Sequence, residues 1–365
     1  MNPHEASTTA PPAGPEHAEQ LPSHQISTAE GPMTVRRAWP HPGAARAILA
    51  VELQDGEAVR SGWWVSGELR LTPRGDDPKL PELASAAQSG VVVSHRPSKR
   101  AVMRSADGRR FVKLVKRGKA AAIKDGMARA ASFSGPYRTP AVLSSTPSSV
   151  TFSALEGHSM HEAHLFSDAQ WRAAWTQICA AWVTALRRPP AAGGASAEAH
   201  SLIHRAAAEI GVLRHWHQST LPWLEDAEQT AHSLERLAGI LAGLPEEQLR
   251  PAHRDLHDKQ LVWSAETGPG LLDADTACLA DPALDLGNLR AHAYLRRLQG
   301  VWSDSAAETV TCCVDEAARS IGAETSTVAV YEQSALLRLG MVYAVRPQYA
   351  GLAAQLRQLV RAQRH

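Results

Sequence analysis

The chain has 365 residues, of which 44% are hydrophobic, and this is enough for more than one packed unit. Its 38 Lys and Arg against 37 Asp and Glu give a formal net charge of +1, which leaves no electrostatic footprint for nucleic acid or an anionic membrane. The sequence contains no apolar run of membrane-spanning length, and residues 1–25 do not resemble a signal peptide. We therefore expect a cytoplasmic protein whose partner is a small molecule.

The first part of the chain predicts a tail followed by an antiparallel β region. Residues 1–35 are rich in Pro, Ala, Ser, Glu and His, so we expect a disordered tail. Residues 36–152 contain apolar runs separated by Asp-Gly turns at 55–56 and 107–108, which indicates a β-rich lobe. Within it, residues 118–133 predict a helix of small residues despite the glycine at 126.

The second part of the chain is mostly helical. Residues 153–158 predict a hinge, and residues 159–365 predict a lobe whose apolar residues recur at helical spacing. One irregular, polar island interrupts the helices at residues 251–285, and such an interruption is where functional side chains are expected. The fold class predicted is therefore α+β, with a small β-rich lobe followed by a larger helical lobe.

The island contains a predicted β-hairpin. The runs LVW (261–263) and GLLDA (270–274) are short, apolar and joined by a polar, Gly-containing turn. Asp255 and Gln260 precede the first strand, and Asp273 ends the second. The hairpin therefore brings these three side chains to one end.

Side chains of these types suit phosphoryl transfer. That reaction needs a carboxylate for the proton of the attacking hydroxyl, oxygen ligands for Mg²⁺, and a cation on the nucleotide phosphates. Asp255 fits the base, and Asp273 and Gln260 fit the metal ligands. Lys113, on a predicted strand after a turn, fits the cation.

Two of these assignments have rivals. Asp275 lies two residues after Asp273 on the same strand face, and we prefer Asp273 because two leucines directly precede it. Lys116 lies three residues after Lys113 and so faces the other side of the strand. We prefer Lys113 because apolar residues flank it on both sides.

Several neighbouring residues are interpreted as structural. A carboxylate before Pro282 suits a helix start, so Asp281 and Asp285 are expected to be structural. His253 is interpreted as a hydrogen-bonded loop organiser, and Trp216 as a packing residue. The histidine-rich stretch 204–217 lacks a second ligand cluster, which favours a solvated helix face over a zinc site.

The island resembles a known family. His253-Arg254-Asp255 with Gln260, followed by Leu271-Leu272-Asp273, resembles the catalytic loop and metal motif of the aminoglycoside phosphotransferase and choline kinase family. The resemblance implies a protein-kinase-like fold, ATP and Mg²⁺ as cofactors, and Asp255 as the catalytic base. It also implies that the segment FSALEG (152–157) is the adenine-binding hinge, with Ser153 and Leu155 as the contacts.

This sequence departs from the family pattern at three places. Gln260 replaces the usual Asn, and this resembles the loop of maltokinases and bacterial glucosamine kinases; Arg254 replaces Gly. The segment SHRPSKRAVMR (94–104) stands where a Gly-rich nucleotide-covering loop is expected, with Ser94, Ser98 and Lys99 as candidate phosphate contacts. No Glu follows Lys113 in the predicted helix, so the usual Lys–Glu pair becomes at best a pair with Asp125.

The function expected is transfer of a phosphoryl group from ATP to a hydroxyl of a small molecule. By resemblance, the acceptor is an aminoglycoside, an amino sugar, a sugar or an amino alcohol, and acidic residues of the helical lobe are candidates for receiving an amine: Asp226, Glu228, Asp315 and Glu316. The alternative is a nucleotide-binding regulator that has lost catalysis, which the missing Glu and the unusual covering loop favour and the retained Asp255 and Asp273 oppose. A protein kinase is disfavoured because no A-P-E-like segment follows Asp273. GTP as the donor and the oligomeric state stay open.

Overall fold

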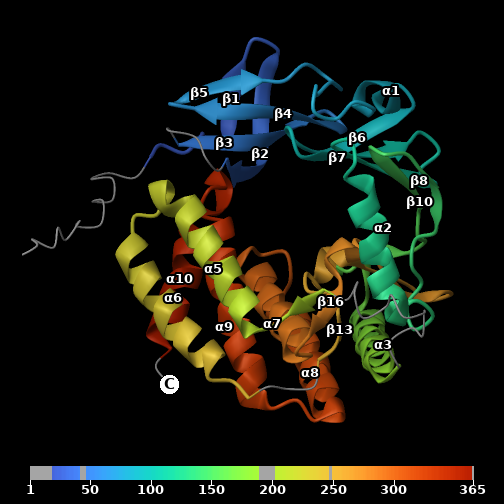
Figure 1. Cartoon of the computed structure of the whole chain (residues 1–365), viewed down its shortest axis with the longest axis vertical. Coiled ribbons are helices and arrows are strands. Elements are labelled where there is room, and N and C mark those ends of the chain that lie inside the picture. The colour runs from blue at the N-terminus through green and yellow to red at the C-terminus, as the bar shows by residue number, and fades with distance from the viewer. Residues whose placement is uncertain (1–18, 42–46, 189–201, 246–248, 364–365) are drawn as a thin grey trace, which may run out of the picture.

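The computed structural model describes residues 19–41, 47–188, 202–245 and 249–363. Two antiparallel β-sheets come first in the chain, and helices dominate after them. Figure 1 shows the sheets gathered at one end of the molecule and the helices at the other. The prediction of an α+β fold with a β-rich first lobe and a helical second lobe is confirmed.

The first sheet is an antiparallel meander with the order β1-β2-β3-β4-β5. The predicted Asp-Gly turn joins its third and fourth strands, where Asp55 pairs with Ala58. The strands are β1 (Gln25–Thr28), β2 (Gly31–Pro40), β3 (Ile48–Asp55), β4 (Ala58–Val65) and β5 (Glu68–Leu71).

This sheet begins earlier than the sequence predicts. β1 and the first half of β2 lie within residues 1–35, so the prediction of a disordered tail is wrong for residues 25–35. Met33 and Val35 are buried in a small core that also contains Trp223 and Val345 of the helical part. Isolated apolar residues carry little local signal, and only the distant partners bury them. Residues 1–18 of the predicted tail lie outside the described residues.

The second sheet has the order β6-β7-β8-β10-β9 and follows a short helix, α1 (Leu83–Ala87). The predicted turn at Asp107-Gly108 joins β7 to β8, and Lys113 lies on β8 between two neighbouring strands. The strands are β6 (Gly90–Arg96), β7 (Arg100–Ser105), β8 (Arg110–Val115), β9 (Val142–Ser145) and β10 (Ser149–Ser153).

A buried carboxylate joins the two sheets. Glu52 on β3 is fully buried and accepts hydrogen bonds from the Ser94 hydroxyl (2.8 Å) and the His95 backbone N–H (2.7 Å) on β6. The segment expected to cover the nucleotide is therefore tied to the first sheet. The Ser94 hydroxyl, one of the candidate phosphate contacts, serves that connection.

Helix α2 (Ala120–Arg129) runs from the sheets toward the helical part (Figure 1). Glycine usually destabilises a helix interior, but at position 126 it is needed because α2 lies very close to the backbone of Asp275. A Cβ atom at this position would lie 2.4 Å from the backbone oxygen of Asp275. The glycine lets α2 pack directly on the loop that follows Asp273.

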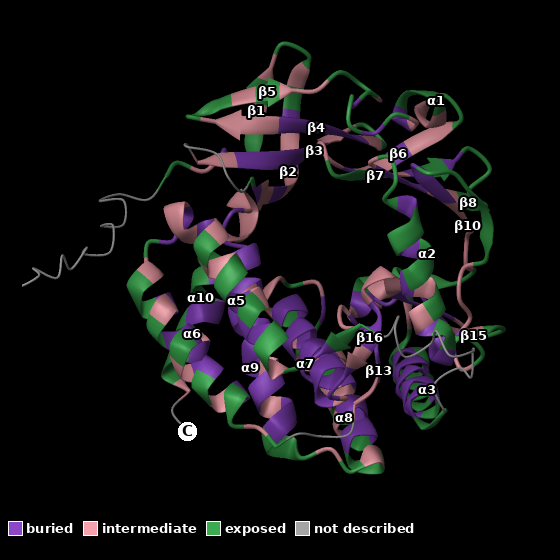
Figure 2. Cartoon of the chain, viewed as in Figure 1, coloured by how far each residue is buried: buried purple, intermediate pink, exposed green. Residues whose placement is uncertain are grey.

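The helical part is built around α7 and α9, which Figure 2 shows as largely buried. Ser167 caps α3 through a capping box with Gln170. In the part of the chain that the structure describes, no helix has the length and apolar character needed to span a bilayer. The helices are α3 (Asp168–Arg187), α5 (Ala206–Thr220), α6 (Ala227–Ala242), α7 (Ala283–Leu298), α8 (Asp304–Ile321), α9 (Thr325–Val342) and α10 (Ala350–Ala362).

Short strands and 3₁₀ turns interrupt these helices at the polar island, with two small sheets of order β11-β14-β15 and β12-β16-β13. The elements are β11 (His158–Ser159), β12 (Ile203–His204), β13 (Arg250–Ala252), β14 (Leu261–Ser264), β15 (Gly268–Leu271) and β16 (Cys278–Ala280), with 3₁₀ turns η4 (Asp258–Gln260) and η5 (Ala274–Thr276).

Candidate active site

The predicted hairpin is formed by β14 and β15. Leu261 pairs with Leu271, and one step further the Leu272 N–H donates to the Gln260 carbonyl at 2.8 Å. Gln260 and Asp273 therefore lie at the same end of the hairpin. Asp273 then turns the chain away in the left-handed region, with φ of 55°.

Hydrogen bonds join the loop that carries Asp255 to the loop that carries Asp273. His253 is fully buried and its Nε2 donates to the carbonyl of Leu272 at 2.9 Å. In return, the Thr276 hydroxyl donates to the His253 carbonyl at 3.0 Å. The interpretation of His253 as a loop organiser is supported, and the two loops form one unit.

Asp285 on α7 fixes this unit through hydrogen bonds to its backbone. It is fully buried, and its two carboxylate oxygens accept the backbone N–H groups of His253 and Arg254, each at 2.8 Å. Burial raises the pKa of Asp285, although these hydrogen bonds and the nearby His253 oppose the rise. Asp285 is structural, as the sequence indicates, and its structural role is to hold the backbone just before Asp255.

Lys113 meets two carboxylates. Its Nζ lies 2.6 Å from Asp273 Oδ1 and also contacts Asp275 Oδ2. Burial alone would raise the pKa of Asp273, but the charge and hydrogen bond of Lys113 lower it to about 2. Burial raises the pKa of Asp275, and the charge of Asp273 adds to the rise. The structure thus brings together both rival metal ligands and the strand lysine.

The expected pair between Lys113 and Asp125 is not formed. Asp125 is exposed on α2, and Lys113 pairs with Asp273 and Asp275 instead. Instead, Arg129 ties α2 to the site: its Nε donates to the Ala277 carbonyl at 2.7 Å and its Nη2 to the Asp275 carbonyl at 3.2 Å. The sequence analysis missed this residue because an arginine at a helix end carries no motif.

Asp255 faces a pocket of about 140 Å³. Its side chain is 46% exposed, and its Oδ2 lies 3.9 Å from His257 Nε2. Helices α5, α7 and α9 form the far walls, so Trp216 lines the pocket as well as packing on the core. Beside Asp255, the lining residues that matter chemically are Glu209, Trp216, Arg254, Thr276, Asn288 and Arg338.

The predicted hinge follows β10. The Ser153 N–H donates to the Ala141 carbonyl at 2.9 Å, so only the Ser153 carbonyl is left to accept from a ligand. Leu155 is half-buried, and among the described residues its backbone groups have no hydrogen-bond partner. A carbonyl followed two residues later by an N–H matches the donor and acceptor edge of a purine base.

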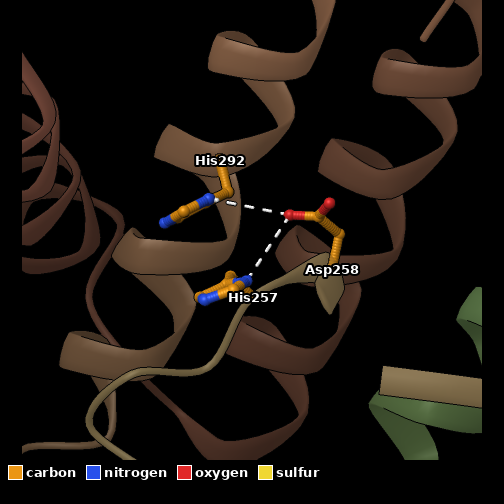
Figure 3. Close-up of side chains that lie close together, drawn as sticks. All are labelled: His257, Asp258 and His292. Atoms are coloured by element: carbon orange, nitrogen blue, oxygen red, sulfur yellow. Dashed lines mark ion pairs between the residues drawn. The ribbon is translucent and has the colours of Figure 1, made fainter. Parts of the chain in front are cut away.

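A second polar cluster, formed by His257, Asp258 and His292, follows Asp255 closely in the chain and draws His292 from α7 (Figure 3). His257 and His292 stack with ring centroids 4.5 Å apart, and the Nδ1 atom of each lies within 3.7 Å of Asp258 Oδ1. These three residues could geometrically surround a metal ion. However, Arg296 already occupies both oxygens of Asp258, at 2.8 and 3.0 Å, and a bound cation would face that guanidinium. The cluster is therefore a closed charge network.

Two of the acidic residues considered for an amine are engaged elsewhere. Asp226 is bound by Arg357, and Asp315 by Arg290. Neither lines the pocket beside Asp255.

Comparison with known proteins agrees with this geometry. Residues 94–308, more than half of the chain, match the model of the phosphotransferase enzyme family known as APH. The chain belongs to this family. Comparison with curated protein sequences gives no match.

Solved structures show the fold of this phosphotransferase. The aminoglycoside phosphotransferase APH(3'')-Id from Streptomyces rimosus aligns with a TM-score of 0.52 and 22% identity, over 72% of this chain and 96% of that one. ADP-bound APH(2'')-Ib aligns with a TM-score of 0.50 and 13% identity, over 78% and 97%. A glucosamine kinase aligns at 0.45 with 15% identity, over 90% and 93%. The predicted kinase-like fold and family are confirmed; the resemblance of the Gln260 loop to maltokinases stays a prediction.

Proposed function

We propose that this phosphotransferase moves the γ-phosphoryl group of ATP to a hydroxyl of a small molecule. One observation carries the proposal: the half-exposed Asp255 faces a pocket, and its loop is hydrogen-bonded to the loop where Asp273 and Asp275 meet Lys113. A base for the acceptor and a charged cluster for the nucleotide thus belong to one rigid unit. Phosphoryl transfer depends chiefly on such positioning and on charge stabilisation.

The charged cluster fits a divalent cation. Two carboxylates share the single ammonium of Lys113, and among the described residues no second cation forms an ion pair with either of them. Oxygen ligands with surplus negative charge suit Mg²⁺, which Asp273 and either Asp275 or Gln260 would hold. A Mg²⁺ ion held there would supply positive charge against the negative charge that develops on the transferred phosphoryl group. Lys113 would then turn to the phosphates, and Ser153 and Leu155 would receive the adenine.

Asp255 orients the acceptor hydroxyl and takes its proton. The hydroxyl oxygen forms a bond to the γ-phosphorus while the bond from that phosphorus to the β,γ-bridging oxygen breaks. ADP leaves with the electron pair of the broken bond, and the proton ends on a carboxylate oxygen of Asp255. Asp285 contributes by holding the backbone of residues 253 and 254 in place.

Replacement of the base tests the proposal and separates it from a nucleotide-binding regulator. In Asp255→Asn we expect kcat to fall roughly 10²- to 10⁴-fold, the range for removal of a general base. Nucleotide affinity, measured by calorimetry with ADP and Mg²⁺, should stay within about twofold of the original protein. Asp304→Asn is the matched control, since Asp304 is 90% exposed on α8.

Two outcomes would contradict the proposal. If Asp255→Asn turns over ATP as fast as the original protein, Asp255 is not the base. If the original protein binds nucleotide but releases no ADP with any hydroxylated amine or sugar, the regulator is the better description.

A further inference from the structure

Arg254 stands at a strained position beside the base. Its φ is 71°, in the left-handed region, where a side chain other than that of glycine costs free energy. Such strain persists at functional positions when the side chain is needed there. Because an arginine stands here in place of the family's glycine, we look for a function of its guanidinium group.

The Arg254 guanidinium is available to a ligand. The backbone N–H of Arg254 is held by Asp285, but its side chain makes no hydrogen bond or ion pair with any residue that the structure describes. The side chain is half-buried and lines the pocket that Asp255 faces. A cation in this situation presents unpaired donors to whatever occupies the pocket.

A second arginine stands on the far wall. Arg338 on α9 donates from Nη2 to Asn288 Oδ1 at 2.6 Å, and Asn288 donates in turn to the Leu256 carbonyl at 2.8 Å. This chain fixes the Arg338 side chain relative to the catalytic loop. Two arginines thus line one pocket, and one of them is held in place by hydrogen bonds to the loop next to the base.

The acidic groups of the pocket do not offer a free receptor for an amine. Glu209 is buried, with Oε1 accepting from the Ser334 hydroxyl at 2.7 Å and Oε2 paired with His204 at 3.0 Å. Burial would raise the pKa of Glu209, but His204, Arg338 and Ser334 lower it, so the carboxylate is ionised and matched internally. Asp255 is reserved for the proton of the acceptor hydroxyl.

We propose that Arg254, assisted by Arg338, binds a carboxylate of the acceptor, so that the substrate is a small hydroxylated carboxylic acid rather than a polycationic aminoglycoside. The inference rests on the proposed function. Guanidinium groups bind carboxylates through paired, charge-assisted hydrogen bonds. A carboxylate brings one negative charge, whereas a phosphate monoester brings nearly two and would repel the nucleotide phosphates more strongly. The indole of Trp216 supplies an apolar wall for the carbon skeleton.

Matched acceptors test the inference on the full chain with ATP and Mg²⁺. The sets are D-glucuronate, D-glucose and D-glucosamine; D-galacturonate, D-galactose and D-galactosamine; and glycerate with glycerol. ADP release gives kcat and KM for each. We expect the carboxylate member of at least one set to have a KM at least tenfold below that of its neutral and amine counterparts.

Variants of Arg254 then assign the effect. In Arg254→Gln, which removes the charge and keeps the left-handed residue non-glycine, KM for the carboxylate acceptor should rise about 10- to 100-fold, the range for a hydrogen bond to a charged group. KM for ATP and for neutral acceptors should not change. Arg254→Lys should recover part of the loss. Arg172→Gln, an exposed arginine on α3, is the matched control.

Each remaining outcome overturns a defined claim. If neutral or amine acceptors are preferred and Arg254→Gln leaves their KM unchanged, the carboxylate inference fails while the proposed function stands. If KM for ATP rises instead, Arg254 acts on the nucleotide and the inference fails. If no acceptor of any charge is phosphorylated, the proposed function fails and takes the inference with it.

Discussion

Two ion networks lie near the loop that carries Asp255, and they differ in how completely the protein neutralises them. In one, Asp258 is fully buried and receives Arg296 through both oxygens, together with His161 at 2.6 Å. In the other, Asp273 and Asp275 share Lys113 and keep part of their surface exposed. The first network is matched without a ligand, whereas in the second, among the described residues, two carboxylates form ion pairs with one cation.

This difference separates a structural charge cluster from a ligand-binding one. A buried charge that is matched by the protein costs free energy to disturb and gains nothing from a ligand. A cluster with surplus charge at a partly open surface is improved by a counter-ion. The His257, Asp258 and His292 cluster has metal-like spacing, yet its charge balance assigns it to the first kind.

Breaking the closed network should have the largest effect on stability. Asp258→Asn leaves Arg296 with an uncompensated buried charge, so we expect the free energy of unfolding to fall by about 3–5 kcal/mol. Urea unfolding followed by fluorescence measures this change. Glu235→Gln is the control, because its pair with Arg214 is 58–60% exposed and is screened by water. A loss at Asp258 no larger than that of the control would refute the structural assignment.

Breaking the network of Lys113, Asp273 and Asp275, here called the open network, should instead remove activity. Asp273→Asn is expected to lower kcat/KM at least about 100-fold, as for loss of a group that stabilises transition-state charge. Asp275→Asn run in parallel decides between the two carboxylates. Should Asp275→Asn abolish turnover while Asp273→Asn keeps it, the assignment of the metal ligand is reversed.

The packing of α2 on the open network can be tested with two glycine-to-alanine variants. We expect them to change stability in opposite directions. Gly126→Ala places a Cβ atom 2.4 Å from the Asp275 backbone oxygen, so we expect about 1–3 kcal/mol of destabilisation from overpacking and a higher KM for ATP. Gly239→Ala on α6 meets nothing within 4 Å, and we expect a gain of about 0.5–1 kcal/mol from helix propensity. Equal effects of the two variants on thermal unfolding and on KM for ATP would show that the packing of α2 does not affect the Asp273–Asp275 loop.

The smallest expected effect is a pH dependence of stability. Because the pKa of Asp273 is lowered to about 2, the folded state binds fewer protons than the unfolded state between pH 2 and about 4. The contribution of Asp273 is thus present above its unfolded pKa and is lost as pH falls through the folded value. Unfolding followed from pH 5 to pH 2 should show a weaker acid loss in Asp273→Asn than in the original protein. Identical pH profiles would contradict the lowered pKa.

The sequence by itself determined the order of the lobes and the residues of the catalytic hairpin. Turn residues such as Asp55-Gly56 and the two short apolar runs of 261–263 and 270–274 act locally, over a few residues, and local signals survive without a partner. For that reason the placement of Gln260 and Asp273 at one end of a hairpin agrees with the structure.

Only the tertiary structure decided which charges meet. Lys113 and Asp273 are separated by 160 positions in the chain, and Lys113 takes Asp273 and Asp275 rather than Asp125 as partners. Burial of Met33 and Val35, the close approach at Gly126 and the position of Arg254 on the pocket wall also depend on residues far away in sequence. Charge pairing and packing depend on distance in space, which a pattern of residue types along one segment does not contain.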